Sequence, residues 1–391
     1  MLSNEQIAFI QQHITATPTA LLLKFGKEKE FLIAQIEARQ KARNKLPTWF
    51  AEPRLVFPPA VSVEQSSSET TARYKAEIMR QAASHTLIDA TGGMGIDAFF
   101  FSNYFDSVTY IEQNEKLAER AHHNFEVLKA NNITAICGDS IAHLRQLKDK
   151  ADWLYLDPAR RTADQRRVVG LADCEPDITT HLPLLLEKAH RLLIKVSPLL
   201  DLTQTLREVP QITTVYVVAV ENECKELLLE IGISSSELLV KTINFKNDGS
   251  SQSFDFQWAD EPTAAVSFSN PLRYVYEPNA AVLKAGAFKS LAAMYQVAKL
   301  APHSHLYTSE SLLPHFPGRI FELIDVIKAD TKALIPYLTN GKANLTIRNF
   351  PATADELRKK LKLKDGGDVY LLATTLSNGD KRLLVCNKAS L

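Results

Sequence analysis

The segment Leu87–Phe99, LIDATGGMGIDAF, constrains the fold of this chain more than any other part. Apolar residues lead into the acidic Asp89, a run of small residues follows, and a helix is expected from Ile96. Glycines allow the backbone N–H groups of such a loop to approach a ligand closely, next to a helix N-terminus that favours negative charge. The pattern predicts a strand, a tight loop and a helix that together bind a ligand.

Carboxylates also follow three later predicted strands. Ser107–Ile111 ends in Glu112, Ile133–Cys137 leads into Gly138-Asp139-Ser140, and Asp152–Leu156 ends in Asp157-Pro158. The carboxyl ends of parallel strands meet at one edge of an open sheet, where such folds bind ligands. We therefore expect these carboxylates and Asp89 to line one crevice. Glu112 could accept both ribose hydroxyls of an adenosine, and Asp139 its exocyclic amine.

Two cofactor classes fit this arrangement. The segment Gly93–Ala98 also matches the dinucleotide-binding pattern G-x-G-x-x-A, and Glu112 suits NAD and S-adenosylmethionine equally well. The segments that follow the fifth predicted strand distinguish the two cofactor classes. After a fifth strand at Arg191–Val196, the segments Thr213–Val220 and Glu226–Ile231 are close enough to pair as an antiparallel hairpin at the sheet edge, whereas a further parallel strand needs a crossover of about a dozen residues or more.

With this ending the chain resembles the class I S-adenosylmethionine-dependent methyltransferases. Its segments DATGGMGIDAF and YLDP are similar to those of bacterial rRNA guanine-N2 methyltransferases. The resemblance implies S-adenosylmethionine as cofactor and a Rossmann-like α/β sheet, mostly parallel with an antiparallel hairpin at its edge. It also implies a set of cofactor-binding residues and a catalytic pair: Asp89, Thr91, Gly92, Gly93, Met94, Gly95, Glu112, Asp139 and Ser140 for the cofactor, and Asp157 with Pro158 for catalysis.

The resemblance has two departures. Thr91 stands where many members have a glycine, and Ala159-Arg160 replaces the Pro-aromatic pair that stacks on a target base. Asp157 and the Pro158 carbonyl would accept hydrogen bonds from an exocyclic amine, guanine N2 being favoured, while the enzyme aligns the amine with the methyl donor. Asp-Pro-Ala-Arg also resembles RNA uracil-C5 methyltransferases, but these need a cysteine where this chain has Ser197-Pro198.

Simpler roles remain open for several of these residues. Asp157 could cap a strand end before a tight turn, and Asp97 could interact with a helix dipole instead of the cofactor. Arg160 and Arg161 could hold substrate phosphates or lie in a solvated loop. For the whole chain, the alternatives are an NAD(P)-dependent oxidoreductase and a noncatalytic RNA-binding protein with a vestigial cofactor fold.

The chain is expected to have four parts. These are a helical region at 1–75, the methyltransferase domain at 76–235, a β-appendage with a ferredoxin-like α+β region at 236–330, and a THUMP-like α+β domain at 331–391. The β-appendage follows from a hairpin turn at Asn247–Ser250 between strand-like runs. The parts after it rest on a resemblance, from about Asn270 onward, to bacterial methyltransferases with a THUMP-like domain, and THUMP domains bind tRNA. Residues 343–386 predict β-α-β-β. The tract Glu64–Thr71 could be a plain linker, could cover the cofactor as the segment before the first strand often does in methyltransferases, or could contain a serine or threonine helix cap, which is favoured.

The composition adds limits on partners. The 391 residues include 45 basic and 45 acidic side chains, so any RNA-binding surface must be local. Residues 24–45 and 341–365 each hold seven basic and three acidic side chains. The four cysteines are scattered without metal-site spacing, and neither a membrane span nor a signal peptide is evident. We expect a reduced, cytoplasmic protein that acts on rRNA or tRNA without a metal; its oligomeric state is not indicated.

Overall fold

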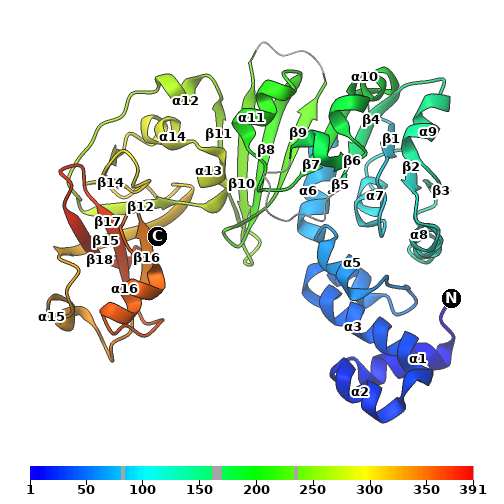
Figure 1. Ribbon diagram of the computed structural model, residues 1–391, viewed down its shortest axis with the longest axis horizontal. Coiled ribbons are helices and arrows are strands. Elements are labelled where there is room, and N and C mark those ends of the chain that lie inside the picture. Colours follow the sequence, from blue (N-terminus) through cyan, green and yellow to red (C-terminus); the bar gives the residue numbers. More distant parts are fainter. Residues whose placement is uncertain (81–83, 161–169, 233–236, 391) are drawn as a thin grey trace. The chain divides into compact units, whose positions relative to one another are not determined.

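A computed structural model describes residues 1–80, 84–160, 170–232 and 237–390 (Figure 1). The chain divides into two compact units, one formed by Met1–Thr213 with Leu228–Ser234 and the other by Thr214–Leu227 with Ser235–Leu391. The largest sheet has nine strands in the order β11-β10-β8-β9-β7-β4-β1-β2-β3. None of the helices in the described parts of the chain combines the length and apolarity needed to cross a membrane.

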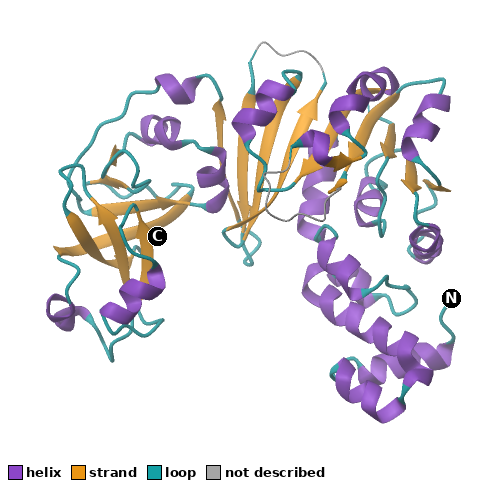
Figure 2. Cartoon of the chain, in the orientation of Figure 1, coloured by secondary structure: helices purple, strands orange, loops and turns teal. Residues whose placement is uncertain are grey.

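Helices occupy the chain up to Met79 (Figure 2). They are α1 (Asn4–His13), α2 (Pro18–Phe25), the short 3-10 helix η1 (Lys27–Lys29), α3 (Glu30–Lys45), α4 (Pro47–Ala51), α5 (Ala60–Gln65) and α6 (Glu69–Met79). The Ser68 hydroxyl accepts a hydrogen bond from the N–H of Thr71, which caps α6. The helix cap predicted within Glu64–Thr71 is therefore confirmed, and this segment is not a plain linker.

Strands and helices then alternate as in a Rossmann-like fold. The elements are β1 (Thr86–Asp89), α7 (Ile96–Phe101), β2 (Ser107–Glu112), α8 (Glu115–Val127), β3 (Ile133–Cys137), α9 (Ser140–Gln146), β4 (Ala151–Leu156), the small pair β5 (Ala159–Arg160) and β6 (Cys174–Glu175), η2 (Leu171–Asp173), α10 (Ile178–Lys188), β7 (Ala189–Val196) and α11 (Leu202–Glu208). Strand β1 is parallel to β2 and β4, β2 to β3, and β4 to β7. The carboxyl ends of these strands consequently meet at one edge, and the predicted fold class is confirmed.

The predicted hairpin is present, but its position in the sheet differs. Strands β8 (Ile212–Val220) and β9 (Glu223–Ile231) are joined by Glu221 and Asn222, which both have positive φ as a type I′ turn requires. Two further strands extend the sheet beyond this hairpin: β10 (Leu239–Phe245) is parallel to β8, and β11 (Ser251–Gln257) is antiparallel to β10. The expected β-appendage is thus the continuation of the main sheet, because β8 offers its free edge to β10.

The second unit has a sheet of its own, ordered β13-β14-β12-β15-β18-β17-β16. Its strands are β12 (Tyr274–Pro278), β13 (Ala298–Lys299), β14 (Tyr307–Ser309), β15 (Gly318–Ile327), β16 (Asn344–Arg348), β17 (Val369–Thr375) and β18 (Lys381–Lys388). Its helices are α12 (Asp260–Thr263), α13 (Ala280–Ala285), α14 (Phe288–Tyr295), α15 (Thr331–Leu334), η3 (Ile335–Tyr337) and α16 (Ala354–Lys360). The predicted β-α-β-β order at 343–386 is confirmed. Since β15 pairs with β18, the expected boundary at 330/331 lies within this sheet.

Glu277 ties distant strands of this second sheet together. Its side chain is 2% exposed and forms ion pairs with Arg319 of β15 and Arg348 of β16. Two arginines around one carboxylate satisfy a charge that would otherwise be costly to bury. Gly318 is required beside it, because a Cβ there would lie 2.0 Å from the Glu277 carbonyl oxygen. Glu277 and Gly318 therefore have a structural role, which is to hold the strands of the second sheet together.

Candidate functional site

A pocket of about 810 Å³ lies at the carboxyl ends of β1 to β4 in the first unit. Seven of the predicted site residues line it: Thr91, Gly93, Met94, Glu112, Asp139, Ser140 and Asp157. Asp89, Gly92, Gly95 and Pro158 are not among its lining residues. Residues of the segment before β1, including Ser62, Gln65 and Ser66, also line the pocket. The chain preceding the first strand therefore covers one side of the site.

Glu112 is held in place by backbone donors. The N–H of Gly93 donates to Oε2 at 2.8 Å, and the N–H of Asn114 donates to Oε1 at 2.7 Å. Each carboxylate oxygen retains a further lone pair, so the oriented side chain can still accept hydrogen bonds from a ligand in the pocket. This arrangement suits the two hydroxyls of a ribose.

Asp139 combines a structural contact with a position in the pocket. Its Oδ1 accepts a hydrogen bond from the N–H of Ala142 at 2.7 Å and so caps α9, which begins at Ser140. The residue is exposed and lines the pocket, so its other oxygen can face an adenine amine. A carboxylate has acceptor sites enough for both contacts.

Asp89 lies beneath the loop. It is 1% exposed, and its Oδ1 accepts the N–H of Thr91 at 3.2 Å. Burial, followed by the neighbouring charge of Asp97, raises the pKa of Asp89 well above its usual value. We infer that this carboxyl supports the loop from below, while Glu112 and Asp139 face the pocket.

The glycines of the loop have different roles. A Cβ on Gly92 would lie 2.1 Å from the Tyr110 ring, and one on Gly95, at φ +86°, would lie 2.6 Å from Phe125. Glycine is needed at these two positions because core side chains occupy the space that a Cβ would fill. Gly93 has φ +54° and lines the pocket, but its Cβ would meet no atom closer than 3.9 Å. The sequence analysis placed both Gly93 and Gly95 against the ligand, whereas only Gly93 lines the pocket.

Substitutions at these two glycines are expected to have different effects. Gly95→Ala should destabilise the protein by roughly 2–4 kcal/mol, since overpacking against Phe125 adds to the cost of a positive φ. Gly93→Ala should cost only about 1–2 kcal/mol, from its positive φ. Its methyl group should instead weaken cofactor binding. Thermal unfolding and calorimetry with S-adenosylhomocysteine measure the two effects. Equal loss of stability in both variants would contradict this assignment.

Asp157 is connected to both neighbouring strands. Its N–H donates to the Thr91 hydroxyl at 2.5 Å, and its Oδ2 accepts a hydrogen bond from the Lys195 ammonium, also at 2.5 Å. The first contact explains the departure at Thr91, because a glycine could not hold the turn after β4. Lys195 was missed in the sequence analysis. Its place near the carboxyl end of β7, which is parallel to β4, is the signal that could have identified it.

The arginines that follow Asp157 are less informative. Arg160 belongs to β5, which pairs with Cys174 of β6, and this small ladder holds the backbone after Pro158. Arg161 lies outside the described residues. Their predicted role in binding substrate phosphates stays a prediction. In the described parts of the chain, no cluster of histidine, cysteine or acidic side chains could hold a metal ion.

A buried ionic cluster lies under the pocket. The Lys75 ammonium contacts Asp97 Oδ1 at 2.9 Å and donates to the Ser67 hydroxyl at 2.6 Å. Ser67 and Tyr155 both donate to Asp97 Oδ2, at 2.8 and 3.0 Å. Burial alone would raise the pKa of Asp97, but the charges of Lys75 and Lys195 and the hydrogen bonds from Lys75 and Ser67 outweigh it and lower the pKa. Asp97 is therefore more than a helix-start residue. It accepts hydrogen bonds both from Ser67, which follows the pocket-lining Ser66, and from Tyr155 of β4, and so connects this segment to the sheet.

A solved structure is similar to this chain over its whole length. The crystal structure of the "putative methyltransferase from Porphyromonas gingivalis W83" is 34% identical, covers 100% of both chains and has a TM-score of 0.88. The chain belongs to the class I S-adenosylmethionine-dependent methyltransferases. A second long match is an uncharacterized S-adenosylmethionine-dependent methyltransferase of Mycobacterium tuberculosis, 23% identical over 91% of this chain and 95% of that protein. S-adenosylmethionine is thus the cofactor of this methyltransferase, and the carboxylates lining the pocket fit it.

Parts of the methyltransferase match narrower families. Residues 84–158 match the model for RNA cap guanine-N2 methyltransferases, 274–317 a ferredoxin-like domain and 318–388 a THUMP-like domain. The ribosomal RNA small subunit methyltransferase J of Coxiella burnetii (strain Dugway 5J108-111) is 34% identical over an alignment of 135 residues that covers 30% of this chain. The chain spans only about half of that relative, 51% of its length.

Glu112→Ala is expected to weaken cofactor binding about tenfold to a hundredfold. A hydrogen bond to a charged group typically contributes roughly 1.5–3 kcal/mol, and this substitution removes the proposed ribose acceptor. Calorimetry with S-adenosylhomocysteine measures the affinity. Glu115→Ala is the matched control, because Glu115 is exposed at the start of α8 and does not line the pocket. Wild-type affinity in the Glu112 variant would rule out this role.

Proposed function

We propose that this methyltransferase methylates an exocyclic amine of structured RNA, with guanine N2 as the favoured target atom. The observation that carries the proposal is the position of Asp157: it lines the same pocket as Glu112 and Asp139, and it lies at the end of β4. A carboxylate there can accept hydrogen bonds from an amine that faces the cofactor's methyl group. The backbone carbonyl of Pro158 would accept a second hydrogen bond from the same amine.

The chain's own residues would act mainly by orientation. The cofactor supplies an activated methyl group, so the amine nitrogen forms the new N–C bond while the C–S bond breaks and its electron pair stays on sulfur. Asp157 would hold the amine so that its lone pair points along this line, and would accept a hydrogen bond as positive charge develops on nitrogen. The proton that the methylated nitrogen then loses would pass to this carboxylate and from there to solvent. Thr91 and Lys195 hold Asp157 itself. Orientation of this kind can lower a barrier by roughly 7 kcal/mol or more.

RNA is the proposed acceptor for two reasons. The partial relative from Coxiella burnetii is named as a ribosomal RNA methyltransferase, and residues 84–158 match a guanine-N2 family. The THUMP-like match at 318–388 supports an RNA-binding part of the chain. Ala159-Arg160 replaces the Pro-aromatic pair that stacks on the target base in other amine methyltransferases, so other residues must hold the base. A cytoplasmic site of action, where rRNA and tRNA occur, belongs to the same proposal.

Transfer of a labelled methyl group tests the acceptor class. The protein is incubated with tritiated S-adenosylmethionine and a cell extract from which RNA and protein fractions are then separated. We expect label in the RNA fraction, removable by ribonuclease and resistant to protease. Label in the protein fraction would contradict the proposal. RNA binding without any transferred label would favour a noncatalytic RNA-binding protein.

A further inference from the structure

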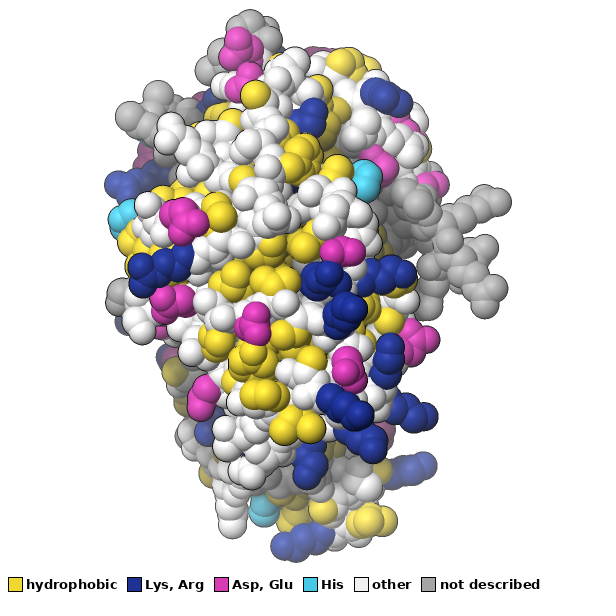
Figure 3. Space-filling view, turned by 90° about the vertical axis from the view of Figure 1, so that its left-hand side faces the viewer, with side chains coloured by type: hydrophobic (Ala, Val, Ile, Leu, Met, Phe, Trp, Pro, Cys, Tyr) yellow, Lys and Arg dark blue, Asp and Glu magenta, His cyan; other side chains and the backbone are white. Residues whose placement is uncertain are grey.

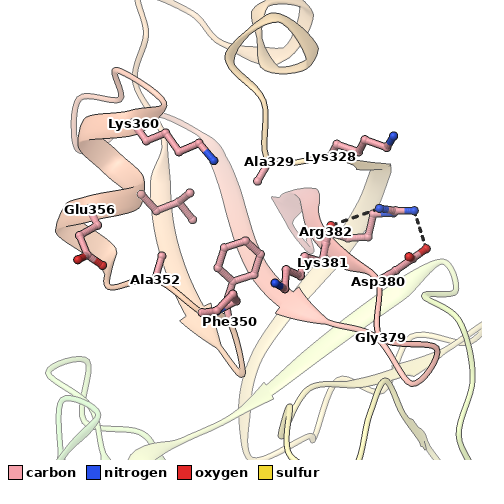
Figure 4. Close-up of a pocket in the computed structure, with 12 residues that line it drawn as sticks. Lys328, Ala329, Phe350, Ala352, Glu356, Lys360, Gly379, Asp380, Lys381 and Arg382 are labelled. Atoms are coloured by element: carbon pink, nitrogen blue, oxygen red, sulfur yellow. Dashed lines mark hydrogen bonds and ion pairs between the residues drawn. The ribbon is translucent and has the colours of Figure 1, made fainter.

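A second pocket, of about 500 Å³, lies in the part of the chain that matches the THUMP-like domain. Three segments form it, as Figure 4 shows: the residues after β15, the connection from β16 into α16, and the turn that leads into β18. Pockets of roughly 300–1,000 Å³ hold small organic ligands. This one has the volume for one nucleotide.

One wall of the pocket is apolar and aromatic. Phe350, Pro351 and Ala352 lie side by side along it, and Leu357 of α16 continues it. Phe350 is half-buried and packs against the core of this domain, so apolar contacts support one part of its ring while another part is exposed. A partly exposed ring is a surface on which a planar group can stack.

The rim of the pocket is cationic. Lys328, Lys360 and Lys381 are exposed, and within the described ranges none of these ammonium groups forms an ion pair. Figure 4 shows Lys360 and Lys381 extending toward the Phe350 ring from different sides. Lysines and arginines also gather along one edge of the face drawn in Figure 3, beside exposed hydrophobic side chains.

The two acidic residues of the pocket are engaged elsewhere. Glu356 accepts the N–H of Thr353 at 2.8 Å as part of the α16 cap, and Figure 4 shows it pointing away from the ring. Asp380 accepts a hydrogen bond from Arg382 at 2.6 Å. With Arg382, four cationic side chains line the pocket against these two carboxylates, so its net charge is positive and it favours an anionic ligand.

We propose that this pocket binds one unpaired nucleotide of the RNA substrate, with its base on the Phe350 ring and its phosphates between Lys360 and Lys381. The inference rests on the proposed function and names how the substrate is held. Stacking on an aromatic ring with lysines beside it is how single-stranded nucleic acid is commonly bound. In a duplex the bases stay stacked on each other, so only a loop, bulge or end can place a base here.

Fluorescence anisotropy with the full-length protein tests this inference. The probes are a short single-stranded RNA and a blunt duplex that contains it. Phe350→Leu keeps the apolar packing and removes the aromatic ring; we expect it to weaken single-strand binding about fivefold to a hundredfold. Lys360→Gln and Lys381→Gln should each lower the slope of log affinity against log salt by about 0.7. Lys359→Gln is the matched control, because Lys359 neighbours Lys360 on α16 but does not line the pocket.

The outcomes separate the pocket from the proposed function. Preference of the wild type for the single strand, lost in the pocket variants and kept in the Lys359 variant, would support the inference. If the pocket variants bind and methylate RNA as the wild type does, the pocket inference is overturned and the proposed function stands. If the wild type neither binds nor methylates RNA, both are overturned. Stronger binding of the duplex would also overturn the pocket inference.

Discussion

Replacing Lys75 by methionine is expected to lower the free energy of unfolding by about 3–5 kcal/mol. The side chain of Lys75 is 0% exposed and forms an ion pair with Asp97. The Lys75 ammonium also donates to Ser67, and the Tyr155 hydroxyl donates to Asp97. Methionine fills a similar volume but removes the ammonium group 2.9 Å from the Asp97 carboxylate, which stays buried. Removal of one partner from a buried ion pair leaves the other charge uncompensated, which is the costly case.

Denaturant unfolding of three variants tests this expectation. Arg73→Met is the matched control: Arg73 also lies on α6 and pairs with Glu69, but it is 54% exposed, so its loss should cost no more than about 1 kcal/mol. In the double variant Lys75→Met with Asp97→Asn, the buried charge is gone and part of the stability should return. A loss below about 1 kcal/mol in Lys75→Met would contradict the account. Since Ser66 lines the pocket next to Ser67, the single variant should also bind cofactor more weakly.

Asp157→Ala is expected to lower turnover at least tenfold while cofactor affinity is retained. A tenfold loss corresponds to about 1.4 kcal/mol of transition-state stabilisation. The substitution removes the acceptor that faces the target amine and leaves Glu112 and Asp139 in place. It also removes the carboxylate that accepts a hydrogen bond from the Lys195 ammonium.

Two variants separate the role of Asp157 from a general loss of structure. Asp157→Asn keeps the backbone contact to Thr91 and the shape of the side chain, so it should remain folded and still transfer methyl groups slowly. Asp149→Ala is the matched control, because Asp149 is exposed just before the opposite end of β4. Methyl transfer and S-adenosylhomocysteine affinity are measured on the same preparations. Normal turnover in Asp157→Ala would leave this residue with a structural role only.

Much of the site could be predicted from the sequence because it follows from parallel topology. Carboxylates at the ends of successive parallel strands must meet at one edge, and Glu112, Asp139 and Asp157 do line one pocket. The loop and helix after β1 were visible in the glycine pattern for the same local reason. The β-α-β-β order predicted for 343–386 is present, and the structure shows that Thr353 caps its helix α16.

Contacts between distant segments could not be predicted in this way. The pairing of Lys75 with Asp97 depends on how α6 packs against α7, and no spacing in the sequence encodes it. Gly95 has the same local pattern as Gly93, yet its missing side chain makes room for Phe125 of α8. The position of the β8–β9 hairpin in the sheet depends on whether β10 pairs with the free edge of β8. Local sequence patterns do not show which strands pair.

The identity of the methylated nucleoside tests the central claim most directly. Wild-type protein is incubated with S-adenosylmethionine that carries a deuterated methyl group and with RNA that lacks the modification. The RNA is then digested to nucleosides and analysed by mass spectrometry. The account predicts the heavy methyl group in N2-methylguanosine, and its absence from the same RNA treated with Asp157→Ala. Heavy label in a ribose or at carbon 5 of uracil, or label that is equal in both samples, would contradict it.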